Sequence, residues 1–154
     1  MKKLTEGDPA PAINAVDQQG KPITLEEFKG KKVVLYFYPK DDTTGCTAEA
    51  CDLRDNYDTF LEKGYEVIGV SADSEASHQK FIAKHKLPFR LIPDVDKKVI
   101  MAYNAWGEKK LYGRSYDGIL RKTFIIDEEG KIEKIIEKVK TKEHSRQIFD
   151  ELSH

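Results

Sequence analysis

The sequence feature that most restricts the fold is a run of β-branched and aromatic residues, KVVLYFY, at positions 32–38. A strand with one face in water alternates apolar and polar side chains, whereas a strand buried on both faces does not. This run, and the similar run EVIGV at 66–70, therefore predict central strands that are covered on both faces. The apolar stretch 33–38 is far shorter than the roughly 20 residues that a membrane-spanning helix needs.

Helices are expected between and after these strands. From position 44 to Gly64, apolar residues recur at helical spacing: Ala50, Leu53, Tyr57, Phe60 and Leu61. Shorter elements are expected at 13–16, 22–24, 25–28, 74–86, 89–92 and 97–103, followed by strands at 119–126 and 131–139 and a helix from 141. Alternating strands and helices predict parallel strands with helical crossovers, and the late hairpin adds antiparallel strands. The predicted fold class is α/β, thioredoxin-like, with a mixed central sheet and helices on both faces.

Length and charge narrow the possible functions. The 154 residues suit a single domain, spanning 1–154. The 26 Lys and Arg nearly cancel the 27 Asp and Glu, so the sequence gives no indication of a nucleic-acid or membrane partner. The opening segment MKKLTEGDPAPAI has no apolar core of the kind that a secretory signal contains. We therefore expect a soluble, cytoplasmic protein.

The metal-binding residue types show no ligand pattern. Two cysteines are too few for a disulfide scaffold or a cysteine-rich zinc site, and the histidines lack HExxH spacing. Neither a cofactor nor a metal is predicted. We expect Asp41 and Asp42 to be solvated loop charges, and His78 and His85 to lie on the surface of a helix.

Cys46 is placed where the first buried strand has ended and a helix begins. The first turn of a helix has unpaired N–H groups, and the helix dipole adds positive potential there. Both favour the ionised thiolate, so Cys46 is a candidate nucleophile. The alternative is that Cys46 is a small buried packing residue.

The residues around Cys46 form the pattern P-x-x-x-T-x-x-C, with Pro39 and Thr43. The stretch FYPKDDTTGCTAEACDLRD, together with Arg121 in GILRKTFIID, resembles the peroxiredoxin family, in particular its peroxiredoxin Q, or bacterioferritin comigratory protein, subfamily. The resemblance extends from GDPAP near the start to the closing helix. The sequence departs from it at Thr44, where the subfamily often has proline.

This resemblance implies a role for each motif residue. Cys46 would attack the peroxide and become a sulfenic acid. Thr43 and the Cys46 backbone N–H would bind the peroxide oxygens, and Arg121 would stabilise the thiolate and the transition state. Pro39 would shield the sulfur from water, and Glu49 would orient Arg121.

Each of these residues also has an ordinary structural interpretation. Thr43 could be only a helix N-cap, and Pro39 only the end of a strand. Arg121 could be a surface strand residue paired with an acidic side chain. Glu49 could be a solvated residue of the first helical turn.

Cys51 follows Cys46 by five positions. On an ideal helix, five residues separate two side chains by about 140° and about 7.5 Å of rise. A disulfide usually needs Cα atoms within about 7 Å and converging side chains. The two cysteines can therefore pair only if the helix unwinds locally, which predicts faster amide exchange at 47–54 on oxidation. The resemblance implies such a disulfide, with Cys51 resolving and thioredoxin as reductant; the alternative is that Cys51 is a bystander.

The resemblance thus implies a thiol-dependent peroxidase for hydrogen peroxide and organic hydroperoxides. Two other functions remain open: a thiol-disulfide oxidoreductase of the thioredoxin type, which would use C-x-x-C rather than C-x-x-x-x-C, and a redox-sensing switch protein. Peroxide preference is expected to depend on Tyr38, Trp106 and the loop at 111–112. Relatives include monomers and some dimers, so a monomer is expected, with a dimer as the alternative.

Overall fold

The computed structural model describes residues 3–152 and has a five-stranded central sheet. Its strands, in spatial order, are β5 (Arg90–Pro93), β4 (Tyr65–Ser71), β3 (Lys32–Phe37), β8 (Lys122–Ile126) and β9 (Ile132–Ile136). The strands β3, β4 and β5 are parallel, whereas β8 pairs antiparallel with β3 and β9 antiparallel with β8. The predicted mixed sheet is confirmed.

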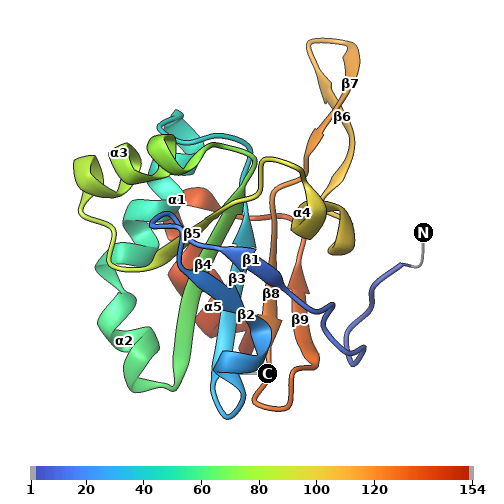
Figure 1. Ribbon diagram of the computed structural model, residues 1–154. Helices are drawn as coiled ribbons and strands as arrows, with labels where there is room; N and C mark the ends of the chain where they lie inside the picture. The colour runs from blue at the N-terminus through green and yellow to red at the C-terminus, as the bar shows by residue number, and fades with distance from the viewer. Residues whose placement is uncertain (1–2, 153–154) are drawn as a thin grey trace.

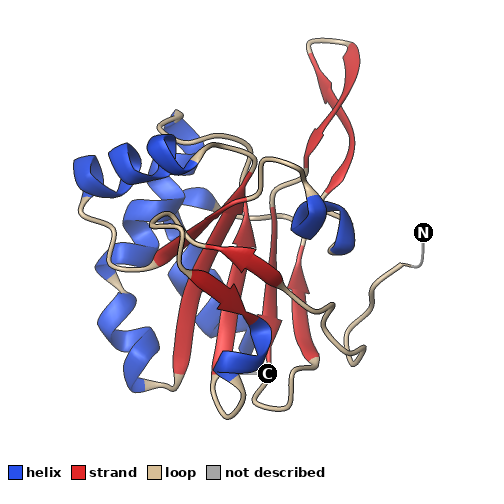
Figure 2. Ribbon diagram, in the orientation of Figure 1, coloured by secondary structure: helices blue, strands red, loops and turns tan. Residues whose placement is uncertain are grey.

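The central strand β3 explains why the run at 32–38 does not alternate. Val33 and Leu35 point into one apolar cluster, and Val34 and Tyr36 into a second cluster on the other face of the sheet. Helices cover both faces (Figures 1 and 2). The four helices α1 (Thr44–Asp55), α2 (Tyr57–Glu62), α3 (Glu75–His85) and α5 (His144–Leu152) supply the second cluster. The first cluster is covered by α4 (Lys98–Ala102), the 3-10 turn η1 (Leu25–Phe28), and the hairpin of β1 (Asn14–Val16) and β2 (Pro22–Thr24).

Two expected elements are interrupted. The helix expected from position 44 onward is divided at Asn56 into α1 and α2, and the Asn56 side chain donates to the carbonyl of Asp52 at 2.9 Å. The strand expected at 119–126 is also divided, because the chain leaves one strand at Ile119 and enters β8 at Lys122. Arg121 lies in this gap, so it is not a residue of a regular strand.

A hairpin that the sequence did not predict projects from the rest of the fold (Figure 1). It consists of β6 (Trp106–Leu111) and β7 (Arg114–Ile119), which pair with each other in a separate two-stranded sheet. The last part of the chain begins with the 3-10 turn η2 (Thr141–Glu143), so α5 starts at His144 rather than at Thr141. Among the described residues 3–152, no helix combines the length and the apolar character needed to cross a bilayer.

Candidate active site at the start of α1

Cys46 lies near the start of α1, just beyond the carboxyl end of the central strand β3. Its side chain is 1% exposed and packs in the apolar cluster on the α1 face of the sheet. The Thr47 N–H donates to the Thr43 carbonyl at 2.8 Å, which closes the first turn. The Cys46 N–H precedes this bond, so it belongs to the helix-start amides that have no partner within the helix.

Arg121 faces this sulfur from the gap between β7 and β8. Its Nη2 donates to Cys46 Sγ at 3.3 Å, and its Nη1 donates to Glu49 Oε1 at 2.8 Å. Burial acts to lower the pKa of Arg121, but the neighbouring Cys46 and Glu49 outweigh it and raise that pKa. The structure therefore brings Cys46, Glu49 and Arg121 together, although they are far apart in the sequence.

Gly45 leaves the space that Arg121 occupies. A Cβ atom at this position would lie 3.3 Å from Arg121 Nη2. Gly45 was not among the site residues predicted from the sequence, although a glycine in the first turn of a helix costs stability relative to alanine and so indicates a close approach.

Glu49 is fully buried, so it is not the solvated residue that one interpretation allowed. Burial raises the pKa of its carboxyl group to about 7, even though Arg121 acts in the opposite direction. On the side away from Arg121, His144 Nε2 lies 3.5 Å from Glu49 Oε2. Burial lowers the pKa of His144 to about 4. His144 was not singled out as a candidate, and nothing in its local sequence indicates this contact.

These two shifts have opposite effects on stability. Glu49 keeps its proton in the folded state up to about pH 7 but, at its ordinary pKa of 4.5, loses it earlier when unfolded, so it lowers stability as pH rises through this window. His144 binds fewer protons when folded than when unfolded between about 4 and 6.5, so its contribution rises with pH there.

We expect Glu49→Gln to remove only the falling slope. The variant should become more stable than the wild type as pH rises, with a difference of up to about 3 kcal/mol at about pH 8 and little at about pH 4. Urea unfolding at the two pH values measures the difference. A difference that does not change with pH would contradict the buried titration of Glu49.

The other motif residues lie on the loop before α1. Thr43 occupies the N-cap position, but its hydroxyl donates to the Lys40 carbonyl at 2.9 Å and makes no hydrogen bond to the helix backbone. Pro39 is half-buried and follows the end of β3 after one intervening residue, Tyr38. Cys51 is also half-buried, and both cysteines are free thiols on an unbroken α1. The helical form therefore keeps Cys51 apart from Cys46, as the spacing predicts.

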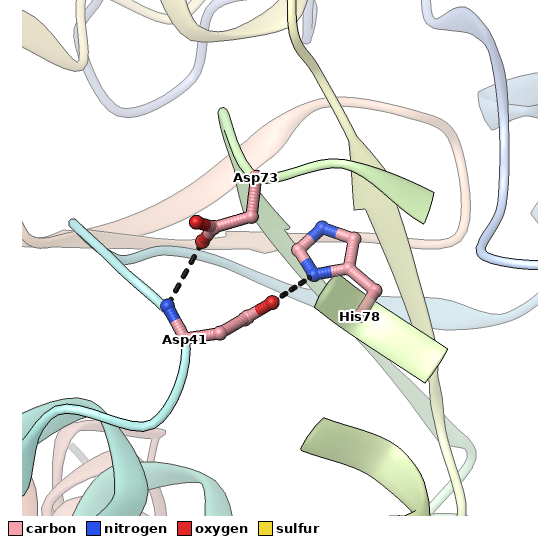
Figure 3. Close-up of side chains that lie close together, drawn as sticks. All are labelled: Asp41, Asp73 and His78. Carbon is pink, nitrogen blue, oxygen red and sulfur yellow. Dashed lines mark hydrogen bonds and ion pairs between the residues drawn. The ribbon is translucent and has the colours of Figure 1, made fainter. Parts of the chain in front are cut away.

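The loop before Cys46 is tied to α3 by a buried cluster of polar side chains (Figure 3). Asp41 Oδ2 lies 2.7 Å from His78 Nδ1, and the Asp41 N–H donates to Asp73 Oδ2 at 2.9 Å. His78 is fully buried and Asp41 is 7% exposed. The predictions that Asp41 is solvated and that His78 lies on the surface are therefore wrong. They failed because only the packing of α3 against this loop brings the two residues together; the exposed Asp42 is as expected.

Hydroxyl groups of neighbouring residues donate to the carboxylate oxygens of this cluster. The hydroxyls of Tyr38 and Ser77 donate to Asp41 at 2.6 and 2.8 Å, and that of Ser71 donates to Asp73 at 2.6 Å. One potential ligand atom from each of Asp41, Asp73 and His78 lies within 4.8 Å of the other two, as metal ligands would. Because they already serve this hydrogen-bond network, we interpret the cluster as an anchor for the loop.

We expect Asp41→Ala to lower the free energy of unfolding by about 3 kcal/mol, because it leaves the buried His78, the buried Tyr38 hydroxyl and the partly buried Ser77 hydroxyl without their partner. Asp42→Asn is the matched control. Asp42 is exposed and has φ 60°, a conformation that asparagine tolerates, so the control should change stability little. Urea unfolding compares the two variants. Equal stabilities for both would show that the cluster does not anchor the loop.

The base of the projecting hairpin lies beside the site. Lys109 Nζ donates to the Ile119 carbonyl at 2.9 Å. The pKa of Lys109 is lowered by burial first and then by the charge of Arg121, with Cys46 acting in the opposite direction. Tyr112, at the hairpin tip, is 96% exposed, whereas Tyr38 is fully buried and bonded to Asp41. Tyr38 therefore has no free surface that could line an open substrate pocket.

A buried cysteine at a helix start, after the central strand of a thioredoxin-like sheet and in contact with an arginine, is typical of thiol-based oxidoreductases. Comparisons with known proteins show which family within this class the chain resembles. The model of the AhpC/TSA family matches residues 6–135. The chain belongs to this family.

Similar proteins cover almost the whole chain. It is 46% identical to Peroxiredoxin Bcp of Bacillus subtilis over 146 residues, covering 95% of this chain and 93% of that protein. It is 43% identical to Peroxiredoxin Bcp of Escherichia coli K12 over 144 residues, covering 94% and 92%. Among solved structures, a Cys-to-Ser mutant of Xylella fastidiosa PrxQ matches with a TM-score of 0.91 and 29% identity, covering 99% and 98%.

A second solved structure bears on activity. Bacterioferritin comigratory protein of Xanthomonas campestris matches with a TM-score of 0.85 and 35% identity, covering 92% of this chain and 90% of that one, and its description refers to alkyl peroxide reduction. The thioredoxin-like fold and the peroxiredoxin Q resemblance are confirmed. The protein is a thiol-dependent peroxidase, an oxidoreductase that acts on peroxides with thiol reductants.

Proposed function

We propose that Cys46 is the residue that attacks the peroxide, with hydrogen peroxide and alkyl hydroperoxides as substrates. The observation that carries this proposal is the 3.3 Å contact between Arg121 Nη2 and Cys46 Sγ. A guanidinium group at this distance favours the thiolate over the thiol. The alkyl substrates are supported by the activity described for the Xanthomonas campestris relative.

The chemistry of the first step assigns a role to each neighbouring residue. The thiolate of Cys46 attacks one peroxide oxygen, the O–O bond breaks, and the other oxygen leaves and is protonated to water or an alcohol. Arg121 stabilises the negative charge that develops on the leaving oxygen. The Thr43 hydroxyl and the Cys46 N–H bind the peroxide oxygens, Pro39 limits the access of water, and Glu49 fixes Arg121 through Nη1.

The second step uses Cys51. Its sulfur attacks the Cys46 sulfenic acid, a disulfide forms, and water leaves. Since α1 is unbroken in the reduced protein, its first turns must unwind for this step. Asp52 limits the unwinding, because its carboxylate accepts from the Ser145 N–H at 2.6 Å. Arg54 adds a second attachment by donating to the His85 carbonyl at 2.8 Å. We therefore expect the unwinding to lie mainly between Thr43 and Asp52.

Thioredoxin, or a similar dithiol protein, is the proposed reductant. A disulfide whose formation breaks helical hydrogen bonds is easily reduced, because reduction allows these bonds to form again. We place the cycle in the cytoplasm, because both cysteines must return to the thiol form, which suits a reducing compartment. The proposed working unit is a monomer of one domain, since Cys46, Glu49 and Arg121 all come from one chain.

We expect Cys51→Ser to reduce one equivalent of peroxide and then stop turning over with thioredoxin, because attack needs only Cys46 whereas recycling needs the disulfide. Cys46 should accumulate as sulfenic acid and be oxidised further by excess peroxide. Stopped-flow measurement of the first round and a steady-state assay with thioredoxin separate the two steps. Undiminished steady turnover would show that Cys51 is a bystander, and a missing first round would contradict the order of the steps.

A further inference from the structure

His144, the first residue of α5, lies on the far side of Glu49 from Arg121. The side chains of His144 and Glu49 are both 0% exposed, and Nε2 of His144 is 3.5 Å from Glu49 Oε2. The same nitrogen lies 2.7 Å from the Thr123 hydroxyl oxygen. Glu49 Oε2 itself has no hydrogen-bond partner among the described residues. A buried carboxylate oxygen left in this way is costly unless a proton is close to it.

The hydrogen bonds around His144 determine where its ring proton is. Nδ1 lies 2.9 Å from Gln147 Oε1. The orientation of that amide is fixed at both ends: Oε1 also accepts from the Lys140 N–H at 2.9 Å, and Nε2 of Gln147 donates to the Lys138 carbonyl at 2.8 Å. Because Oε1 can only accept, Nδ1 carries the hydrogen. In the neutral ring, Nε2 is then an acceptor, directed toward Thr123 and Glu49.

One proton therefore serves two groups. With Glu49 ionised and His144 neutral, Oε2 and Nε2 are both acceptors and face each other across the 3.5 Å gap. The Thr123 hydroxyl, 2.7 Å from Nε2, donates to that nitrogen, whereas Oε2 has no donor among the described residues. A single proton, on Glu49 Oε2 or on His144 Nε2, removes this conflict. Burial raises the pKa of Glu49 to about 7 and lowers that of His144 to about 4, so the proton is held by Glu49 rather than by His144 and is lost near pH 7.

We propose that His144 is a positioning residue for peroxide reduction, which holds the Glu49 carboxyl group and shares its proton, and so sets the charge that Arg121 presents to Cys46. This inference rests on the proposed function. A protonated Glu49 leaves the charge of Arg121 unbalanced beside the sulfur, whereas an ionised Glu49 offsets it. The stabilisation that Arg121 gives to the Cys46 thiolate therefore decreases as Glu49 ionises.

Other charged and titratable groups among residues 3–152 act on this pair. Asp52 acts on both Glu49 and His144 from within α1, and Arg121 acts on both from the gap between β7 and β8. Tyr36, from β3, interacts with Glu49 and Cys46; it is fully buried, and burial raises its pKa well above the usual value. Of Glu49, His144 and Tyr36, Glu49 is therefore the group whose pKa lies near neutral pH.

The test is the pH profile of the second-order rate constant for the reaction of Cys46 with hydrogen peroxide, measured by stopped flow. For the wild type we expect this rate constant to decrease in a step near pH 7, where Glu49 ionises, and we expect Glu49→Gln to remove the step. For His144→Ala we expect a rate about tenfold lower at neutral pH, because the carboxyl group loses its fixed position. The step should also move to lower pH, because water that enters the vacated space reduces the burial that raises the pKa of Glu49. His85→Ala, a partly exposed histidine on α3, is the matched control and should keep the wild-type profile.

A measurement on the unmodified protein covers the case in which His144→Ala does not fold. Nitrogen-15 NMR of the His144 ring in the wild type should show the neutral form with the hydrogen on Nδ1 at neutral pH. A charged ring or a hydrogen on Nε2 would overturn the inference, as would a His144→Ala profile that coincides with the wild type. If wild-type Cys46 fails to react with peroxide at any pH, the proposed function itself is wrong.

Discussion

Replacement of Cys46 by serine is expected to reduce peroxide consumption by at least about a thousandfold at any concentration of reductant. A serine hydroxyl stays protonated at neutral pH, and neither Arg121 nor the start of α1 can convert it into a nucleophile comparable to a thiolate. Serine is close in size to cysteine, so the fold should persist. The assay is the loss of hydrogen peroxide with thioredoxin present, together with circular dichroism of the variant.

The comparison with Cys51→Ser makes this result specific. Both variants lack one thiol, but only Cys46→Ser should lose the first, stoichiometric round of peroxide reduction. If Cys46→Ser retained substantial turnover, or if the two variants behaved alike in the first round, Cys46 would not be the attacking residue.

Replacement of Arg121 by alanine is expected to lower the rate constant for peroxide attack by about 10² to 10³, the usual cost of losing one donor to a developing oxyanion. The variant also loses the cation that faces Cys46 Sγ at 3.3 Å. Glu49 would then be buried without its ion pair, but it can remain protonated, so the loss of stability should be smaller than for an obligatory carboxylate.

Arg90→Ala is the matched control for this variant. Arg90 is another partly exposed arginine in a buried ion pair, with its Nε 2.8 Å from Asp17 Oδ2, but it lies on β5 and not beside Cys46. Its removal should affect stability and leave the rate constant for peroxide attack near the wild-type value. Equal rate constants for the two variants would exclude Arg121 from the chemistry.

The central sheet could be predicted from the sequence because a strand buried on both faces has apolar residues at successive positions. The strands at 32–38 and 66–70 contain apolar residues at successive positions, and β3 indeed directs them alternately into two cores. The hairpin of β6 and β7 has no such pattern. It is rich in lysine, glycine and tyrosine, and it packs little of its length against the sheet, so its pairing left no alternation to detect.

The candidate site was predictable where its residues are neighbours in the sequence. Pro39, Thr43, Cys46 and Cys51 share one loop and one helix, so a motif and a spacing describe them. The contacts of His144 with Glu49 and of His78 with Asp41 depend on how distant helices pack, which no local pattern records. The break before Lys122, which points Arg121 at Cys46, was likewise hidden within what reads as one continuous strand.

In the proposed cycle, α1 opens so that Cys46 and Cys51 can form a disulfide. Peptide mapping by mass spectrometry, combined with amide hydrogen exchange, tests it on protein treated with one equivalent of peroxide. We predict a bond between these two sulfurs, with faster exchange mainly at residues 44–51 and little change in β3 and β4. A sulfur bond to another molecule, no bond between the two cysteines, or identical exchange of α1 in the reduced and oxidised proteins would contradict the claim.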